Sequence, residues 1–138
     1  MLYKGVRALY DGNLADAIEN FHQALEIGFE LEEDVTDWQR LCEYGSPNHM
    51  ADQVLFACDH AVELAPEDGN VRDSRGIARA LAGDYMGAIE DFEFAISVWE
   101  GNHWYYEEKI TLRKAWISEL REGKNPLTEE VLTSLQLR

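Results

Sequence analysis

The stretch GDYMGAIEDFEFAI, Gly83 to Ile96, carries the clearest pattern in the chain. Its small residues alternate with one large ring, Phe92, so a second helix can lie close while the ring fills a pocket. The apolar residues recur at spacings of three and four, which places them along one stripe of an α-helix: Ala88, Ile89, Phe92, Ala95 and Ile96. We therefore expect this stretch to be a structural helix that packs against other helices.

The same pattern occurs once more near the start of the chain, as GNLADAIENFHQAL at residues 12–25. Each matched residue lies 71 positions before its counterpart, and Ala61 lies 34 positions before Ala95. From Ala24 to Ala61 the separation is 37, and the surplus three residues fall in the acidic loop 28–36. A fixed period of this size is typical of repeats built from helix pairs. The matched residues are Gly12, Ala17, Phe21 and Ala24 with Gly83, Ala88, Phe92 and Ala95.

The order of helix starts and stops predicts an all-α protein. We expect helices over 2–10, 14–27, about 38–44, 47–64, 70–82, 84–99 and 103–121, and a short one that Asn125 and Pro126 open. Ser46 is expected to cap the fourth helix with Pro47 in its first turn, and Pro66 to end it. Asp68 or Asn70 is expected to cap the fifth helix.

Three helix pairs in one phase resemble the tetratricopeptide repeat (TPR) family. The resemblance covers residues 1–102, as units of about 1–34, 35–68 and 69–102, and leaves 103–138 as a two-helix cap. Val54 and Cys58 depart from it, since the family pattern has Ala and Phe there. The residues in register are Trp38, Leu41, Cys42, Ala61 and Pro66 in the middle unit, Gly5, Ala17, Phe21 and Ala24 in the first, and Gly76, Ala88, Phe92 and Ala95 in the third.

More narrowly, PEDGNVRDSRGIARALAGDYMGAIEDF and WISELREGKNP look like bacterial TPR modules at the C-terminal end of larger proteins. The resemblance implies a single right-handed α-solenoid that acts as a protein-interaction scaffold, without catalysis or a cofactor of its own. The alternative is a regulatory or assembly domain cut from a larger host with a caspase-like, NTPase or WD-repeat domain. Helical sequence directly after Met1 favours an excised module over a native start.

The net charge is −15, of which residues 1–68 carry −12, and this limits the classes of molecule that we expect the chain to bind. An acidic surface repels phosphate backbones, so we expect neither nucleic acid nor a membrane as partner. A protein or peptide with basic and apolar character, or another domain of the host chain, suits this surface better. Cys42 and Cys58 are expected to be reduced core residues, which favours an intracellular, cytoplasmic protein.

The concave wall of a TPR solenoid is lined by the first helix of each unit, and this implies the partner-binding residues. Tyr3 and Tyr10 are two turns apart, and packing on a neighbouring helix is an even alternative for them. The peptide-carboxylate clamp of some family members is not carried over, because Lys and Asn are missing at its positions. The predicted groove residues are Tyr3, Val6, Tyr10, Gln39, Arg40, Glu43, Asn70, Asp73, Ser74 and Ile77.

Two further clusters each allow two interpretations. Arg72, Arg75 and Arg79 form one helical row that could bind an anion, but internal pairing with Asp59, Glu63, Asp84 or Asp91 is favoured. The aromatic cluster Trp99, Trp104, Tyr105 and Tyr106 could form a peptide pocket, and packing between repeat and cap is favoured. The four histidines show no metal-ligand spacing, so no metal site is expected.

Overall fold

The computed structural model describes residues 2–27 and 34–136, with side chains from Lys4 onward in those ranges. These residues form α-helices and two short 3-10 helices, without a strand, so the all-α prediction is confirmed for them. The elements are α1 (Leu2–Tyr10), α2 (Leu14–Ile27), α3 (Val35–Gly45), η1 (Ser46–Asn48), α4 (Ala51–Leu64), α5 (Gly69–Leu81), α6 (Tyr85–Trp99), η2 (Glu100–Asn102), α7 (His103–Arg121) and α8 (Glu129–Gln136).

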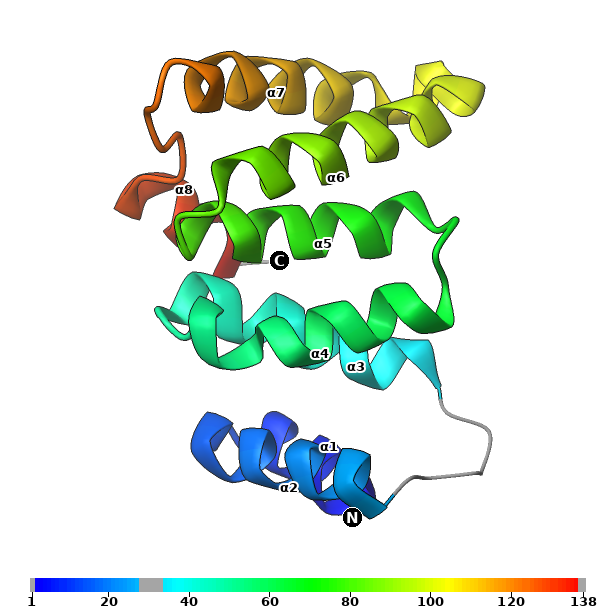
Figure 1. Ribbon diagram of the computed structural model, residues 1–138, viewed down its shortest axis with the longest axis vertical. Coiled ribbons are helices and arrows are strands. Elements are labelled where there is room, and N and C mark those ends of the chain that lie inside the picture. The colour runs from blue at the N-terminus through cyan, green and yellow to red at the C-terminus, as the bar shows by residue number, and fades with distance from the viewer. Residues whose placement is uncertain (1, 28–33, 137–138) are drawn as a thin grey trace.

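The helices follow one another along the long axis of the molecule (Figure 1). α1 packs on α2, α3 on α4 and α5 on α6, while α4 also contacts α5 and α6 contacts α7. Helix α3 touches both α1 and α5, so the first helices of successive pairs form a row. Helix α8 turns back along the stack and contacts η1.

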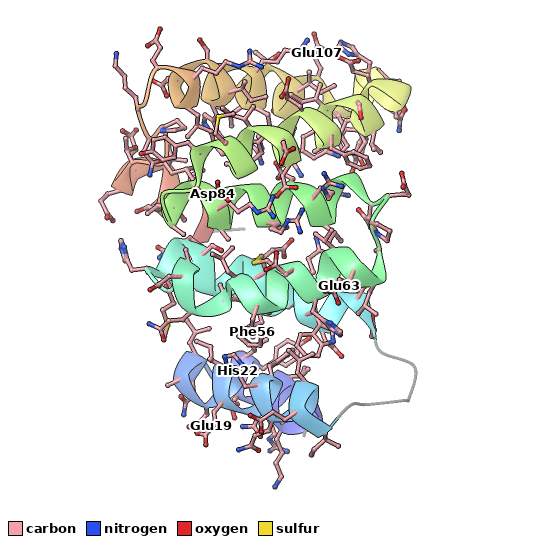
Figure 2. All side chains as sticks on the ribbon, in the orientation of Figure 1. Glu19, His22, Phe56, Glu63, Asp84 and Glu107 are labelled. Atoms are coloured by element: carbon pink, nitrogen blue, oxygen red, sulfur yellow. A yellow bond between two sulfur atoms is a disulfide. The ribbon has the colours of Figure 1, made fainter. Side chains whose placement is uncertain are left out.

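Two apolar clusters fill the interior, and α5 belongs to both. The first cluster holds Phe21, Trp38 and Leu41, and the second holds Phe92 and Trp116. Between the first two pairs, the His22 ring stacks on the Phe56 ring at a centroid distance of 3.6 Å (Figure 2). The first two pairs therefore share one core, and α5 lies between it and the second.

Close approach of the two helices within a pair depends on a glycine that faces a phenylalanine ring. A Cβ atom added to Gly5 would lie 2.7 Å from the Phe21 ring, and one added to Gly76 would lie 2.7 Å from the Phe92 ring. Both rings are fully buried. The matched glycines Gly12 and Gly83 both have positive φ, at 77° and 92°, in the turns before α2 and α6.

In the middle pair a disulfide takes the place of this glycine–phenylalanine contact. Cys42 and Cys58 are bonded, with their Cα atoms 5.1 Å apart, so the expectation of reduced cysteines is wrong. They are separated by 16 residues, as Gly5 and Phe21 are, which puts them at equivalent positions. Because disulfides persist mainly in oxidising compartments, the cysteines no longer support a cytoplasmic protein.

The second departure of the middle pair is compensated one turn further along. Val54 replaces the small residue of the family pattern, and the facing residue on α3 is Gly45, where an added Cβ would collide with the Val54 side chain. Relative to the family pattern, the small residue now lies on α3 and the larger one on α4, and the two helices still pack closely. The irregularity in sequence is matched by complementary packing.

Aspartate side chains cap three of the described helices. Asp34, Asp68 and Asp84 cap α3, α5 and α6 by accepting backbone N–H bonds. The prediction that Ser46 caps the fourth helix is wrong. Its hydroxyl donates to the Cys42 carbonyl at 2.7 Å, and Pro47 lies in η1 instead.

Truncation of the ring in the third pair should test the glycine–ring contact. We expect Phe92→Ala to lower the free energy of unfolding by about 3–5 kcal/mol, because the ring is fully buried against Gly76. Met86→Ala, at a side chain 76% exposed on the same helix, serves as the control. Urea denaturation followed by circular dichroism gives both values, and equal stabilities would contradict the assigned packing.

The equivalence of the disulfide to the glycine–ring contact can be tested by exchange. We expect Cys42→Gly/Cys58→Phe to be more stable than Cys42→Gly/Cys58→Ala by about 3 kcal/mol, because the new ring should fill the space between α3 and α4. The two variants differ only in the ring, so thermal melts compare them directly. If they melt together, positions 42 and 58 are not equivalent to positions 5 and 21.

Candidate partner-binding cavity

A cavity of about 850 Å³ opens between α3, α5 and α7, and η1 and α8 border it. Side chains from α3, α5 and α7 form its walls. Seven predicted groove residues line it together: Gln39, Arg40 and Glu43 from α3, and Asn70, Asp73, Ser74 and Ile77 from α5. The structure therefore brings these seven together, while their role in binding stays a prediction.

Of the three groove residues predicted on α1, Val6 and Tyr10 do not line this cavity. Val6 is half-buried and packs against the first apolar cluster. The Tyr10 side chain is 64% exposed, and its hydroxyl accepts a hydrogen bond from Arg40. The Arg40 guanidinium also lies over the Tyr10 ring, 5.4 Å from its centroid. The side chain of Tyr3 lies outside the described residues.

The third wall, from α7, was missed in the groove prediction. Trp104, Tyr105, Glu107 and Glu108 line the cavity, although residues 103–138 were assigned to a cap. A signal for them existed, because adding the repeat period of 34 to Asn70, Asp73 and Ser74 gives Trp104, Glu107 and Glu108. In its position beside the cavity, α7 is equivalent to the first helix of a further pair.

Buried polar contacts fix the floor of the cavity. Arg113 is 1% exposed and binds Asp73 through two hydrogen bonds, of 2.6 Å and 2.9 Å. The Arg113 guanidinium carbon also lies 4.1 Å from the Trp116 ring centroid. Asn70 accepts a hydrogen bond of 3.2 Å from the indole N–H of Trp99. These contacts tie α5 to α6 and α7, so the floor is held in one arrangement.

Glu43 is the acidic centre of the α3 wall. Its Oε1 accepts hydrogen bonds from Gln39 at 3.1 Å and from the Ser74 hydroxyl at 3.2 Å. Water still reaches the residue, yet burial of the carboxyl among protein atoms raises its pKa, and the two hydrogen bonds and the charge of Lys109 only partly offset this. A cation placed beside Glu43 would therefore favour its charged form.

The arginine row is paired internally, as the favoured interpretation predicted. Asp91 is fully buried and accepts hydrogen bonds from Arg72, Arg75 and Arg79 at 2.9–3.1 Å. Arg75 also reaches Asp59 at 3.3 Å. Burial by itself lowers the pKa of the Arg75 guanidinium, but the bonds and charges of Asp91 and Asp59 outweigh it and raise that pKa.

The aromatic cluster at the start of α7 divides into two parts. Trp99 is 1% exposed and stacks on the half-buried Tyr106, which agrees with the favoured packing interpretation. Trp104 and Tyr105, by contrast, are 79% and 66% exposed at the cavity. Packing accounts for only half of the cluster.

No family model, curated protein or solved structure matches the chain. Among residues 2–27 and 34–136, no group of three or more His, Cys, Asp or Glu side chains is placed to hold a metal ion. Within the same residues, no helix combines the length and apolar character that crossing a bilayer requires.

The shared carboxylate of Asp91 should carry much of the stability of the third pair. We expect Asp91→Asn to lower the free energy of unfolding by about 3 kcal/mol, because three guanidinium groups lose their common partner. Asp59→Asn is the matched control, and since that side chain is 54% exposed its effect should stay below about 1 kcal/mol. Urea denaturation measures both, and similar losses would contradict the central role of Asp91.

Proposed function

We propose that the chain is a TPR-type interaction module that binds a peptide or an extended protein segment along the cavity between α3, α5 and α7. One observation carries the proposal. Seven residues that the TPR resemblance assigned to the concave wall of two units line one cavity. The volume of this cavity, about 850 Å³, falls in the range of ligand-binding pockets.

The packing of the helix pairs supports the TPR part of the proposal. Gly5 faces Phe21 and Gly76 faces Phe92, each glycine 16 residues before its ring, and Cys42 and Cys58 share that separation. The same 16-residue spacing thus recurs in three pairs, and contacts of α1 with α3 and of α4 with α5 join each pair to the next. Stability is then shared along the stack, as in repeat proteins generally.

The charge of the chain supports a partner with basic character. The overall charge is −15, and Glu43, Glu107 and Glu108 stand at the cavity. Acidic surfaces of this kind speed the association of basic segments and make it salt-dependent. Apolar side chains of the partner would supply the buried area that sets affinity.

Selection from a random peptide library on the immobilised chain tests this proposal without assuming a ligand. We expect Glu43→Lys to weaken the selected peptides by roughly tenfold, with a smaller effect at high salt. Glu19→Lys makes the same charge change on α2, at the opposite end of the molecule from Glu107 (Figure 2), and should change binding little. Isothermal titration calorimetry gives the dissociation constants.

Two results would count against the proposal. If the selection enriches no peptide that binds the chain, the chain is not a peptide-binding module. If peptides bind but Glu43→Lys and Glu19→Lys have equal effects, the cavity is not the binding surface. Tyr10→Ala adds a further comparison, because Tyr10 contacts the cavity-lining Arg40 without lining the cavity itself.

A further inference from the structure

We propose that the exposed rings of Trp104 and Tyr105 form the anchor site of this cavity, and that the site binds an arginine or lysine side chain of a basic peptide segment. The inference rests on the proposed function and names the chemistry that the binding surface recognises. Three observations carry it: the exposure of the rings, their fixed position, and the charges around them.

The exposure of the two rings is large for side chains of this size. Trp104 is 79% exposed and Tyr105 is 66% exposed, and both line the cavity. Their rings meet edge to face, with centroids 6.0 Å apart. Adjacent Trp and Tyr side chains beside a cavity are the residues that most often dominate binding energy at protein interfaces.

A chain of ring contacts holds this exposed pair in place. Tyr105 meets Tyr106 edge to face at 4.8 Å, and Tyr106 stacks on the buried Trp99 at 5.4 Å with an angle of 12° between the planes. Trp99 is itself fixed by its hydrogen bond to Asn70. The exposed rings therefore stand on a rigid base, and a ligand would lose little free energy in ordering them.

The charges around the rings favour a cation over an anion. Asp73 and Arg113 neutralise each other on the floor, which leaves Glu43, Glu107 and Glu108 against Arg40 and Lys109 among the described residues that line the cavity. Arg40 lies over the Tyr10 ring and Lys109 over the Trp99 ring. Glu107 and Glu108 lie three and four residues after Trp104 on α7 and are exposed themselves.

The chain uses the same chemistry internally, but not at the two exposed rings. Arg72 lies 4.1 Å from the Phe94 ring centroid, and Arg113 lies 4.1 Å from the Trp116 centroid. Across the described part of the chain, no cation–ring contact involves Trp104 or Tyr105. Their faces are thus open to a cation from a partner, beside acids that would neutralise it.

Three fluorescein-labelled peptides of about ten residues test the ligand chemistry. The first alternates arginine with leucine, the second replaces each arginine by the uncharged citrulline, and the third replaces each arginine by glutamate. Fluorescence anisotropy at about 50 mM and about 300 mM salt measures their dissociation constants. We expect the arginine peptide to bind at least about tenfold more tightly than the other two at the lower salt concentration.

Variants of α7 test the position of the site. Trp104→Ala should weaken the arginine peptide by roughly 5- to 30-fold, and Trp104→Phe, which keeps a ring, should retain most of the affinity. Leu112→Ala is the matched control, because Leu112 is 41% exposed on the same helix but does not line the cavity. It should change binding by less than about twofold. Trp104 is exposed, so circular dichroism melts should show the variants folded as the wild type is.

The outcomes separate this inference from the proposed function. Equal or tighter binding of the citrulline or glutamate peptide, no measurable binding of the arginine peptide, or an arginine peptide insensitive to Trp104→Ala would each overturn the cation site. If library-selected peptides still depend on Glu43 in any of those cases, the proposed function stands and only the inference fails. If selection also yields no Glu43-dependent peptide, both fail.

Discussion

The close approach of two helices within each pair is the constraint on which the rest of the structure depends. In the first and third pairs a glycine leaves room for a buried ring on the facing helix. An added Cβ at Gly5 or Gly76 would lie only 2.7 Å from Phe21 or Phe92. In the middle pair the bond between Cys42 and Cys58 brings the Cα atoms to 5.1 Å. Because all three pairs close in this way, α1, α3 and α5 can lie in one row, and the exposed side of that row supplies the cavity walls on α3 and α5.

The third pair keeps this geometry while exchanging apolar contacts for ionic ones. Arg72 and Arg75 lie 34 residues after the buried Trp38 and Leu41, and Asp91 lies 34 residues after the buried Ala57. The neighbouring ring is kept as well. The Trp38 ring lies 4.4 Å from the His60 ring, and 34 residues later in each helix Arg72 lies 4.1 Å from the centroid of the Phe94 ring. A buried carboxylate is stable here because several guanidinium hydrogen bonds replace its lost water. The three arginines keep partial access to solvent, which limits the cost of burying their charge.

Periodicity in the sequence predicted the features that depend on helical spacing and capping. It did not predict contacts between side chains that lie far apart in the sequence. The helix order and the aspartate cap of α5 follow from helical spacing and capping. The shared cavity position of residues on α3 and α5 was implied by the TPR resemblance. The disulfide was missed because two cysteines 16 residues apart are ambiguous by spacing alone. Their positions matched Gly5 and Phe21, which was the usable signal. The contact of Arg113 with Asp73 joins residues 40 apart in sequence, and no helical pattern could indicate it.

The cavity combines a rigid floor with an open rim, and the two parts have different consequences for recognition. The pair of Asp73 and Arg113 fixes α7 against α5, and the hydrogen bond from Trp99 to Asn70 fixes α6 against α5. The exposed ring of Trp104 packs on Tyr105, and Tyr105 packs on Tyr106, which stacks on the buried Trp99. The exposed rings are thus connected to the buried polar contacts. A partner side chain at the rim would therefore meet a surface already in place, so its affinity would reflect new contacts more than ordering of the protein. The buried polar contacts between α5, α6 and α7 thus support the proposed binding surface, although none of these buried groups needs to touch a partner.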